Sequence, residues 1–578
     1  MSNGGSVIGQ VLKKQGVEFL FTLCGGHIAP ILVGAKENGI RVIDVRHEAN
    51  AVFAADAVSR LSGIPGVAAV TAGPGVTNSV TAIKNAQMAQ SPLILLGGAT
   101  ATLLKGKGAL QDINQIDLYE SITKWTVSIE EDCDIIPIME EAFDVATSGV
   151  PGPVFVECPI DLIYDEKLVR DWYGSEFSKA KTIKQKVINW YVRRHVDKLF
   201  ACSDKTIKIA QNDGIEPFGI DEEDVKEVNS YLKHSERPAL VIGSQATLRV
   251  ELVEDLSKKL KSAGVPIFLT GMARGLMGEG HPLYYRHNRS KALREADVII
   301  IAGMPCDFRL NYGRIINKEG THIAINRSKE DLKVNKKPDI AIQADPGTFL
   351  NQLLADVNIE PHKWSTWKNT LDDREGKGRE KIEKFASMDT KKINPLLLCQ
   401  KINQVLDKES IIIGDGGDFI ATASYTVKPR SPLSWLDPGP YGTLGVGAGF
   451  ALAAKLVHPE KEVWLFYGDG AAGYSIMEFD TFVRHKVPII GVVGNDAGWT
   501  QIERDQVEYL DDDVGTQLEY SDYDNVVKSF GAKGILLSDA KDIERKLSLA
   551  KKMTNDGFPV LVNCLIGKTD YRKGSISM

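Results

Sequence analysis

The chain has 578 residues, which is too long for a single hydrophobic core and predicts several domains. Its net charge is only -7 and its lysines and arginines are dispersed, so the composition excludes a basic nucleic-acid-binding face and favours an enzyme acting on small molecules. Its 7 cysteines show no C-x-x-C spacing, which argues against a disulfide or zinc framework and for a reducing compartment.

Neither end of the chain shows a clear targeting signal. Residues 1–20 lack the basic segment and long apolar core of a signal peptide, and they are typical of the start of a helix. No stretch approaches the roughly 20 apolar residues that a transmembrane helix needs. The final residues, SISM, are not a clear peroxisomal signal. These observations favour the cytosol.

Short apolar runs alternate with helix-like segments and glycine turns in three successive blocks. This rhythm is typical of parallel sheets covered by helices on both faces. We therefore predict an α/β protein of three successive open parallel-sheet domains. The predicted boundaries are 1–180 for the N-terminal domain, 226–357 for a Rossmann-like central domain and 390–578 for the C-terminal domain, with polar helical linkers at 181–225 and 358–389.

The expected strands are apolar runs bounded by turns. They are EFLFTL, RVIDV, GVAAVTAG, SPLILLGG and GPVFVEC in the first block, RPALVIGS, VPIFLT, ADVIIIAG and THIAIN in the second, and SIIIGDGG, EVWLFYGDG, VPIIGVVGN, AKGILLS and FPVLVNCLI in the third.

The segment EVWLFYGDGAAGYS, residues 462–475, contains a literal G-x-G-x-x-G pattern that begins at Gly468. In a dinucleotide-binding loop the carboxylate of Asp469 would repel the pyrophosphate. A divalent cation between them reverses the repulsion, because Mg²⁺ binds carboxylate, carbonyl and phosphate oxygens. The pattern alone leaves both interpretations open, since Asp496 suits the ribose-binding acid of a dinucleotide site.

Asp469 and Asn495 are 26 residues apart, with a helix-like segment and a second apolar run between them. This is a strand-helix-strand distance, so in a parallel sheet both residues reach the carboxyl ends of neighbouring strands, where ligands bind. They can then share one cation, with the Ala497 carbonyl as a third oxygen ligand. The alternative is that Asn495 and Asp496 only form a turn.

The stretch GDGAAGYSIMEFDTFVRHKVPIIGVVGNDAGW resembles the thiamin diphosphate motif, which begins with GDG and ends near an Asn. The resemblance covers almost the whole chain, and its order of pyrimidine-binding, central and diphosphate-binding domains is that of the acetolactate synthase superfamily. RHEANAVFAADAVSRLSG, AVTAGPGVTNSVTAIKNAQMAQSPLILLGG and DPGPYGTLGVGAGFALAAK are most similar to the acetolactate synthase-like group, also described as 2-hydroxyacyl-CoA lyases. The resemblance implies thiamin diphosphate and Mg²⁺, and it leaves nicotinamide as a remote alternative.

Three residues match catalytic positions of the family. Glu48 matches the activating glutamate, whose carboxyl group binds N1′ of thiamin so that the 4′-imino nitrogen can take the proton from C2. Without the family, a Glu at a helix start more often complements the helix dipole. Gln111 resembles a substrate-side glutamine of the synthases. His27 lies where related decarboxylases place a polar group, and a neutral imidazole there would shuttle protons, although a lone His in a glycine turn is often structural.

The resemblance also implies residues that hold the cofactor. AGPGVTN would line the pyrimidine pocket, the Gly442 carbonyl would accept from the 4′-amino group, and Leu444 would hold the cofactor in its bent form. The same segments also suit a tight turn and ordinary core packing. The implied cofactor-binding residues are Gly73, Pro74, Gly75, Asn78, Gly416, Gly417, Asp418, Gly442, Leu444, Gly468, Asp469, Gly470, Ala471 and Asn495, and the implied metal ligands are Asp469, Asn495 and Ala497.

The chain departs from the synthase pattern at two places. Asp418-Phe419 replaces a Gln-His pair near the diphosphate, which leaves the phosphate anchoring open. The central domain lacks the glycine- and methionine-rich segment that contacts FAD in the synthases, so whether this domain holds FAD, ADP or nothing is open. Arg274 and Arg289 suit a nucleotide, although arginines in such loops usually face solvent or form salt bridges.

The resemblance implies a homodimer or homotetramer with active sites between subunits, acting on an acyl-CoA or a 2-oxo acid. We expect a lyase that cleaves 2-hydroxyacyl-CoA to an aldehyde one carbon shorter and formyl-CoA, as in fatty acid α-oxidation. The alternative is acetolactate synthesis from pyruvate and a 2-oxo acid in the branched-chain amino acid pathway. A third hypothesis, an inactive relative, predicts loss of Glu48, Asp469 or Asn495, and all three are present.

Overall fold

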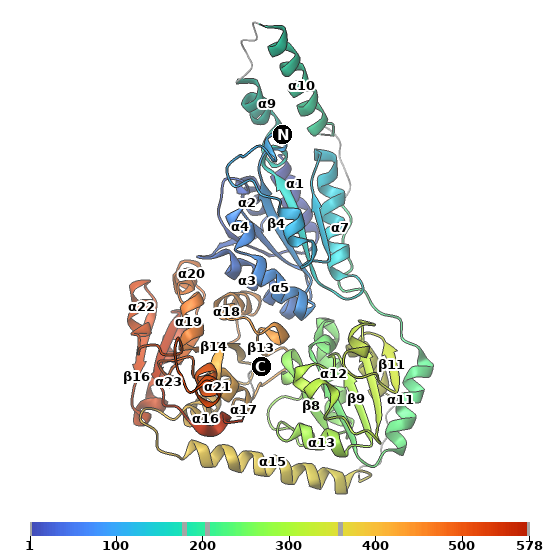
Figure 1. The fold of residues 1–578 in the computed structure, drawn as a ribbon, viewed down its shortest axis with the longest axis vertical. Coiled ribbons are helices and arrows are strands. Elements are labelled where there is room, and N and C mark those ends of the chain that lie inside the picture. The colour runs from blue at the N-terminus through green and yellow to red at the C-terminus, as the bar shows by residue number, and fades with distance from the viewer. Residues whose placement is uncertain (1–2, 176–181, 203–208, 356–361, 575–578) are drawn as a thin grey trace. The chain divides into compact units, whose positions relative to one another are not determined.

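The computed structural model describes residues 3–175, 182–202, 209–355 and 362–574. The chain divides into two compact units, Met1–Glu216 and Pro217–Met578. The first unit contains one open sheet and the second contains two, and every pairing between the described strands is parallel (Figure 1). The predicted α/β class with three successive parallel sheets is confirmed, whereas the predicted domain boundaries stay a prediction.

The first sheet has six strands in the order β2-β1-β3-β4-β6-β5. Its inner strands β3, β4 and β6 are buried along their whole length, which is why they read as continuous apolar runs. The strands are β1 (Phe19–Leu23), β2 (Arg41–Asp44), β3 (Gly66–Val70), β4 (Leu93–Ala99), β5 (Trp125–Ser128) and β6 (Pro153–Pro159). The helices are α1 (Gly4–Lys14), α2 (Ala29–Glu37), α3 (Glu48–Ser62), α4 (Pro74–Thr77), α5 (Val80–Ala89), α6 (Gln115–Glu120), α7 (Ile135–Thr147), α8 (Ile160–Ile163), α9 (Glu166–Ser175) and α10 (Ile183–Leu199).

The second unit begins with a five-stranded sheet in the order β11-β10-β9-β7-β8. Its strands are β7 (Pro238–Ile242), β8 (Ile267–Leu269), β9 (Val298–Ala302), β10 (Thr321–Asn326) and β11 (Ile340–Gln343). The helices that accompany it are α11 (Glu222–His234), α12 (Val253–Ser262), α13 (Arg289–Glu295) and α14 (Pro346–Ala355), and the long helix α15 (Ser365–Ala386) follows them.

The third sheet has six strands in the order β13-β12-β14-β15-β17-β16. They are β12 (Ile411–Asp415), β13 (Trp435–Leu436), β14 (Val463–Gly468), β15 (Ile490–Asn495), β16 (Lys533–Leu537) and β17 (Val560–Leu565). Its helices are α16 (Pro395–Val405), α17 (Gly417–Thr426), α18 (Val446–Val457), α19 (Asp469–Ser475), α20 (Glu478–His485), α21 (Thr500–Leu510), α22 (Tyr523–Ser529) and α23 (Ile543–Asn555). No helix in the described ranges is long and apolar enough to cross a membrane.

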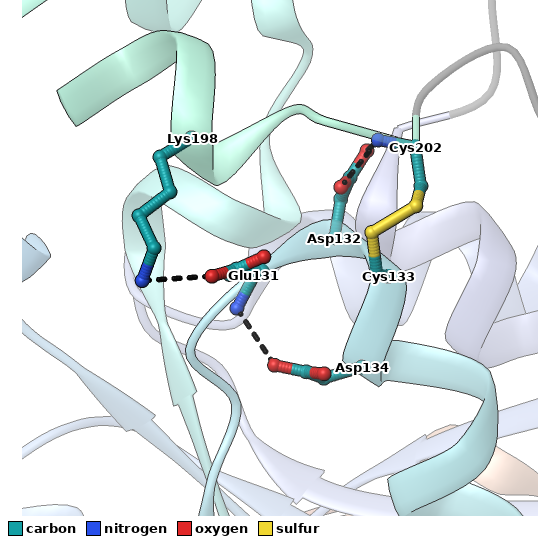
Figure 2. Close-up of a disulfide and its surroundings, with 6 residues drawn as sticks. All are labelled: Glu131, Asp132, Cys133, Asp134, Lys198 and Cys202. Carbon is teal, nitrogen blue, oxygen red and sulfur yellow. Dashed lines mark hydrogen bonds and ion pairs between the residues drawn. A yellow bond between two sulfur atoms is a disulfide. The ribbon is translucent and has the colours of Figure 1, made fainter. Parts of the chain in front are cut away.

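A disulfide joins Cys133 and Cys202 in the first unit, with the two Cα atoms 5.2 Å apart (Figure 2). The prediction against a disulfide was wrong. The two cysteines are separated by 69 positions, and only the return of the chain after α10 brings them together. The backbone N–H of Cys202 donates to the Asp132 carboxylate at 3.0 Å, which holds this return in place.

Candidate functional site

Glu48 lies at the carboxyl edge of the first sheet, where it begins α3 directly after β2. It is 5% exposed, and Nδ2 of Asn78 donates to its Oε2 at 3.1 Å. Gly75 lies against the same carboxyl group, because a Cβ built there would be 3.5 Å from Glu48 Oε1. The structure therefore brings Glu48, Gly75 and Asn78 together.

Gln111 lies against the Gly73 turn, so two distant candidate residues meet. A Cβ at Gly73, whose φ is +61°, would be 2.8 Å from the Gln111 carbonyl oxygen. Gln111 has a positive φ of 63°, which is uncommon for a residue with a side chain. The N–H of Gly73, just before Pro74 at the start of α4, donates to Gln115 Oε1 at 2.9 Å.

Gln115 and Glu157 form a buried network behind this turn that the sequence did not reveal. Gln115 Nε2 donates to the Gly98 carbonyl and to Glu157 Oε1, both at 3.1 Å. Lys105 forms an ion pair with Glu157, and the Ser128 hydroxyl donates to the same carboxylate at 2.7 Å. The network ties the loop that carries Gln111 to β4 and β6.

His27 follows β1 and joins the same edge of the sheet. Its Nδ1 is 3.3 Å from Thr71 Oγ1, and a Cβ at Gly98 would be 2.6 Å from His27 Cβ. Burial lowers the pKa of His27 below its ordinary value of 6.5, so the imidazole is neutral near pH 7. A neutral imidazole can accept a proton from a substrate and return it.

Asp469 and Asn495 lie at neighbouring strand ends of the third sheet, because Gly468 of β14 pairs with Gly494 of β15. The Asp469 carboxylate accepts from the N–H of Gly470 at 2.9 Å and of Gly498 at 3.1 Å. The Asn495 side chain is fully buried and oriented by its donor, since Nδ2 donates to the Ser521 carbonyl and to Asn563 Oδ1, both at 3.2 Å. Its amide oxygen accepts a hydrogen bond from the N–H of Ala497 at 3.4 Å and keeps a second lone pair that suits a cation.

Buried negative charge gathers around these residues. Burial raises the pKa of Asp469. Burial first, and then the charge of Asp469, raise the pKa of Asp496 to about 7. Ala497, which lies between Asp496 and Gly498 in the chain, adopts a positive φ of 57°. A site rich in buried carboxylate, amide and carbonyl oxygens fits a divalent cation, which offsets the charge that burial disfavours.

Three glycines near Asp469 and Asn495 allow close backbone packing. A Cβ at Gly416, whose φ is +70°, would be 2.2 Å from Cδ2 of Leu444. A Cβ at Gly468 would be 2.9 Å from the Gly416 carbonyl oxygen, and one at Gly470 would be 2.4 Å from the Trp499 ring. These turns place backbone N–H groups at the starts of α17 and α19, which suits a phosphate group.

Asp415 fixes the loop that carries Leu444, a role that its position at the end of β12 did not reveal. Its buried carboxylate accepts from the N–H of Gly445 at 3.0 Å and of Gly447 at 2.8 Å. Burial raises its pKa to about 7, although these hydrogen bonds oppose the shift. Gly442, with a φ of +66°, ends the short turn before Leu444.

Asp418 forms an ion pair with Arg504 of α21 at 2.8 Å, and both side chains are mostly buried. The carboxylate that replaces the synthases' Gln-His pair is thus neutralised by a residue of the chain itself. This partner could not be predicted from a local pattern, since 86 positions separate the two residues.

The second unit contains a cavity of about 1030 Å³ that is lined by many of these residues. This volume is large enough for a small-molecule ligand. Gly494, Asp496 and Gly498 line the cavity, whereas their sequence neighbours Asn495 and Ala497 do not. The predicted residues that line the cavity are Arg274, Arg289, Gly416, Gly417, Asp418, Gly442, Leu444, Gly468, Asp469, Gly470 and Ala471.

Arg274 and Arg289 both donate hydrogen bonds to backbone carbonyls at the cavity. Arg274 Nη1 donates to Ser424 at 3.0 Å, and Arg289 Nη2 donates to Arg309 at 2.6 Å. Burial lowers the pKa of Arg289, and the neighbouring charge of Arg274 lowers it further. Clustered guanidinium groups of this kind attract an anionic ligand.

Three sequence families match the chain. They are described as the N-terminal TPP binding domain, the central domain and the C-terminal TPP binding domain of thiamine pyrophosphate enzymes, and they match residues 2–118, 225–353 and 415–564. Thiamine pyrophosphate is thiamin diphosphate, so the family agrees with the donor set and the glycine turns described above.

Curated relatives are similar over the full length. The 2-hydroxyacyl-CoA lyase 2 of Danio rerio is 46% identical over 586 residues, covering 100% of this chain and 93% of the relative. The protein of that name from Homo sapiens is also 46% identical, covering 100% and 92%. The probable acetolactate synthase of Mycobacterium bovis is 31% identical, covering 97% and 95%. The chain belongs to the thiamine pyrophosphate enzyme family.

Proposed function

We propose that this protein is a lyase that uses thiamin diphosphate and Mg²⁺ to cleave a 2-hydroxyacyl-CoA into an aldehyde one carbon shorter and formyl-CoA. The observation that carries the proposal is the full-length similarity to 2-hydroxyacyl-CoA lyase 2 proteins at 46% identity, against 31% for the acetolactate synthase. The reaction belongs to the chemistry of fatty acid α-oxidation.

The metal and the diphosphate would be held by the second unit. Asp469 would offer a carboxylate oxygen to Mg²⁺, Asn495 its amide oxygen and Ala497 its carbonyl oxygen. The glycine turns at Gly416 and Gly468 would donate N–H groups to the phosphates. Bound thiamin diphosphate supplies a nucleophilic carbon and an electron sink for carbon-carbon cleavage.

The first unit would supply the groups that handle protons. Glu48, fixed by Asn78, would donate a hydrogen bond to N1′ of the aminopyrimidine and so favour loss of the C2 proton. His27, kept neutral by burial, would take the proton from the substrate's 2-hydroxyl group. Gln111 would contact the substrate carbonyl.

The proposed cleavage needs no oxidant. The bond between the thioester carbonyl carbon and the hydroxyl-bearing carbon breaks, and the oxygen that loses its proton becomes the aldehyde oxygen. The electron pair of the broken bond stays on the one-carbon fragment, which gains a proton and leaves as formyl-CoA. All atoms of the substrate are therefore present in the two products.

We further propose that each active site combines the first unit of one protomer with the second unit of its partner. The support is that Glu48, His27 and Gln111 lie in one unit, and Asp469, Asn495 and the cavity lie in the other. A homodimer is then the smallest active species, and a homotetramer is a pair of dimers. Arg274 and Arg289 suit an anionic nucleotide but do not distinguish FAD from ADP.

Product analysis by mass spectrometry tests the function. The purified enzyme, with thiamin diphosphate and Mg²⁺, is offered a long-chain 2-hydroxyacyl-CoA or pyruvate. We expect the shortened aldehyde and formyl-CoA from the first substrate and no acetolactate from the second. Glu48→Gln serves as the blank and Glu37→Gln, an exposed position on α2, as the matched active control. Acetolactate as the sole product would favour the synthase alternative.

A further inference from the structure

Helix α10 carries apolar side chains on two opposite faces, although a helix on a domain surface normally has one. Its inner face comprises Val192, Val196 and Leu199, which are all buried in the first unit. At 100° per residue, the positions four and seven residues from Val192 share its face. The inner face accounts for the attachment of the helix but not for the rest of its apolar content.

The outer face of α10 is exposed. Ile183, Val187, Trp190 and Tyr191 are 83%, 59%, 60% and 59% exposed. They follow one another at helical spacing on the side opposite Val192 and Val196. In Figure 1, α10 extends with α9 beyond the body of the first unit. We name these four residues the outer apolar stripe.

Basic side chains surround the outer apolar stripe. The helix contains five basic residues and one acidic residue, Asp197. Asp197 is paired with Arg170, and Lys198 with Glu131, as Figure 2 shows for the second pair. Four basic side chains have no acidic partner among the residues that the structure describes; they are Lys184, Lys186, Arg193 and Arg194.

The residue types on the outer face of α10 indicate what kind of surface it binds. Trp and Tyr prefer the boundary between apolar and aqueous phases, because their rings are apolar and their polar atoms remain hydrated. The guanidinium of Arg194 lies 5.5 Å from the centre of the Trp190 ring, so charge and apolar surface are adjacent. An apolar stripe flanked by Lys and Arg is the composition of a helix that lies in a membrane interface.

A second copy of the chain fits this face less well. A symmetric contact would place the same patch against itself, which would bring Lys186, Arg193 and Arg194 of the two copies together. Like charges at such a contact are repulsive. The anionic surface of a lipid bilayer offers the opposite charge together with an apolar interior.

We propose that α10 docks the protein on an anionic membrane surface, with the outer apolar stripe inserted at the level of the lipid headgroups and Lys184, Lys186 and Arg193 on the lipid phosphates. The helix is about 25 Å long, so it lies along the surface and does not cross the bilayer.

The docking helix is held firmly to the first unit, so binding positions the whole unit. Nε2 of His195 is 2.8 Å from the Thr102 hydroxyl, which donates to the buried Asp161 carboxylate at 2.6 Å. The disulfide between Cys133 and Cys202 fastens the chain directly after the helix (Figure 2). Neither attachment uses a residue of the outer face.

Vesicle co-sedimentation of the full-length protein tests the proposal. The vesicles contain phosphatidylcholine alone or with phosphatidylserine, and the variants are Val187→Ser/Trp190→Ser and Lys184→Glu/Lys186→Glu/Arg193→Glu. The wild type is expected to bind phosphatidylserine vesicles and to lose binding as salt is raised. The charge variant should lower the partition coefficient at least about tenfold, since each basic residue near an anionic surface adds roughly fivefold.

The controls separate docking from folding and from self-association. Lys226→Glu/Lys377→Glu changes exposed lysines of the second unit and should bind like the wild type. Light scattering should give the same mass for the wild type and Val187→Ser/Trp190→Ser. Equal vesicle binding by wild type and both α10 variants would overturn the proposal. So would a wild type that fails to sediment, or a serine variant that dissociates into smaller species, because the stripe would then be a contact between copies.

Discussion

At the scale of single residues, Asp415 shows how burial sets the protonation of a carboxyl group. Its folded pKa of about 7 lies above the ordinary value of 3.8, because burial disfavours the charged form. The folded protein holds this proton more tightly than the unfolded chain does. The resulting stabilisation is fully present below about pH 4 and is lost as the pH rises to about 7.

Asp415→Asn should therefore flatten the pH dependence of stability in the cofactor-free protein. We expect the free energy of unfolding of the wild type to fall by about 2–4 kcal/mol more than that of the variant between pH 4 and pH 8. Urea unfolding followed by tryptophan fluorescence measures the difference. Asp556→Asn, at an exposed position in the same unit, should keep the wild-type slope. Parallel pH profiles for Asp415→Asn and the wild type would contradict the assignment.

The sequence revealed residues that sit in local patterns and missed those that act through distant contacts. Asp469 and Asn495 were found because strand-helix-strand spacing places them at one sheet edge. Gln115, Asp415 and Arg504 were missed, since their partners lie in other segments and no local pattern marks such a contact.

At the scale of elements, the three strands that the sequence missed are all at sheet edges, namely β5, β11 and β13. Each of these three strands is either partly exposed or very short, so it lacks a long continuous apolar run. No residue of β5 is fully buried, β11 alternates, and β13 has only 2 residues. The 14 expected strands comprise the interior strands, whose burial demands apolar side chains, and the edge strands β2, β8 and β16.

Two glycines of α19 provide a matched test of the glycine turns. Gly470 has the Trp499 ring where a Cβ would lie, whereas Gly473 has open space. Gly470→Ala should destabilise by about 1–3 kcal/mol through overpacking and raise the KM for thiamin diphosphate. Gly473→Ala should change stability by no more than about 1 kcal/mol. Thermal unfolding and cofactor titration of both variants give the comparison, and identical effects would refute the close contact with Trp499.

The disulfide between Cys133 and Cys202 can be tested by counting free thiols. Under denaturing, non-reducing conditions we expect five free thiols, and after reduction all 7 cysteines should react. Replacing Cys133 and Cys202 by Ser should lower the unfolding free energy by about 2–4 kcal/mol, because the bond closes a long loop. Cys24→Ser, at an exposed free cysteine, should have little effect. Seven reactive thiols before reduction would exclude the bond.

At the scale of the whole molecule, the proposed site requires two chains. Glu48→Gln inactivates the first unit and Asp469→Asn the second, so neither homodimer should turn over. A mixed dimer, isolated with two different affinity tags after co-expression, has one intact pair of units out of two. Its activity should be about half that of the wild type. No activity above that of the parents would place both units of a site in one chain.

The central claim, cleavage beside the thioester carbonyl, is tested most directly by following one labelled carbon. A 2-hydroxyacyl-CoA carrying ¹³C at the carbonyl position is incubated with the enzyme, thiamin diphosphate and Mg²⁺, and the products are read by ¹³C NMR and mass spectrometry. We predict that the label appears in formyl-CoA, or in formate released from it, and that the aldehyde is unlabelled. Label in the aldehyde would contradict the proposed reaction. So would an enzyme that leaves the 2-hydroxyacyl-CoA unchanged but converts pyruvate to acetolactate.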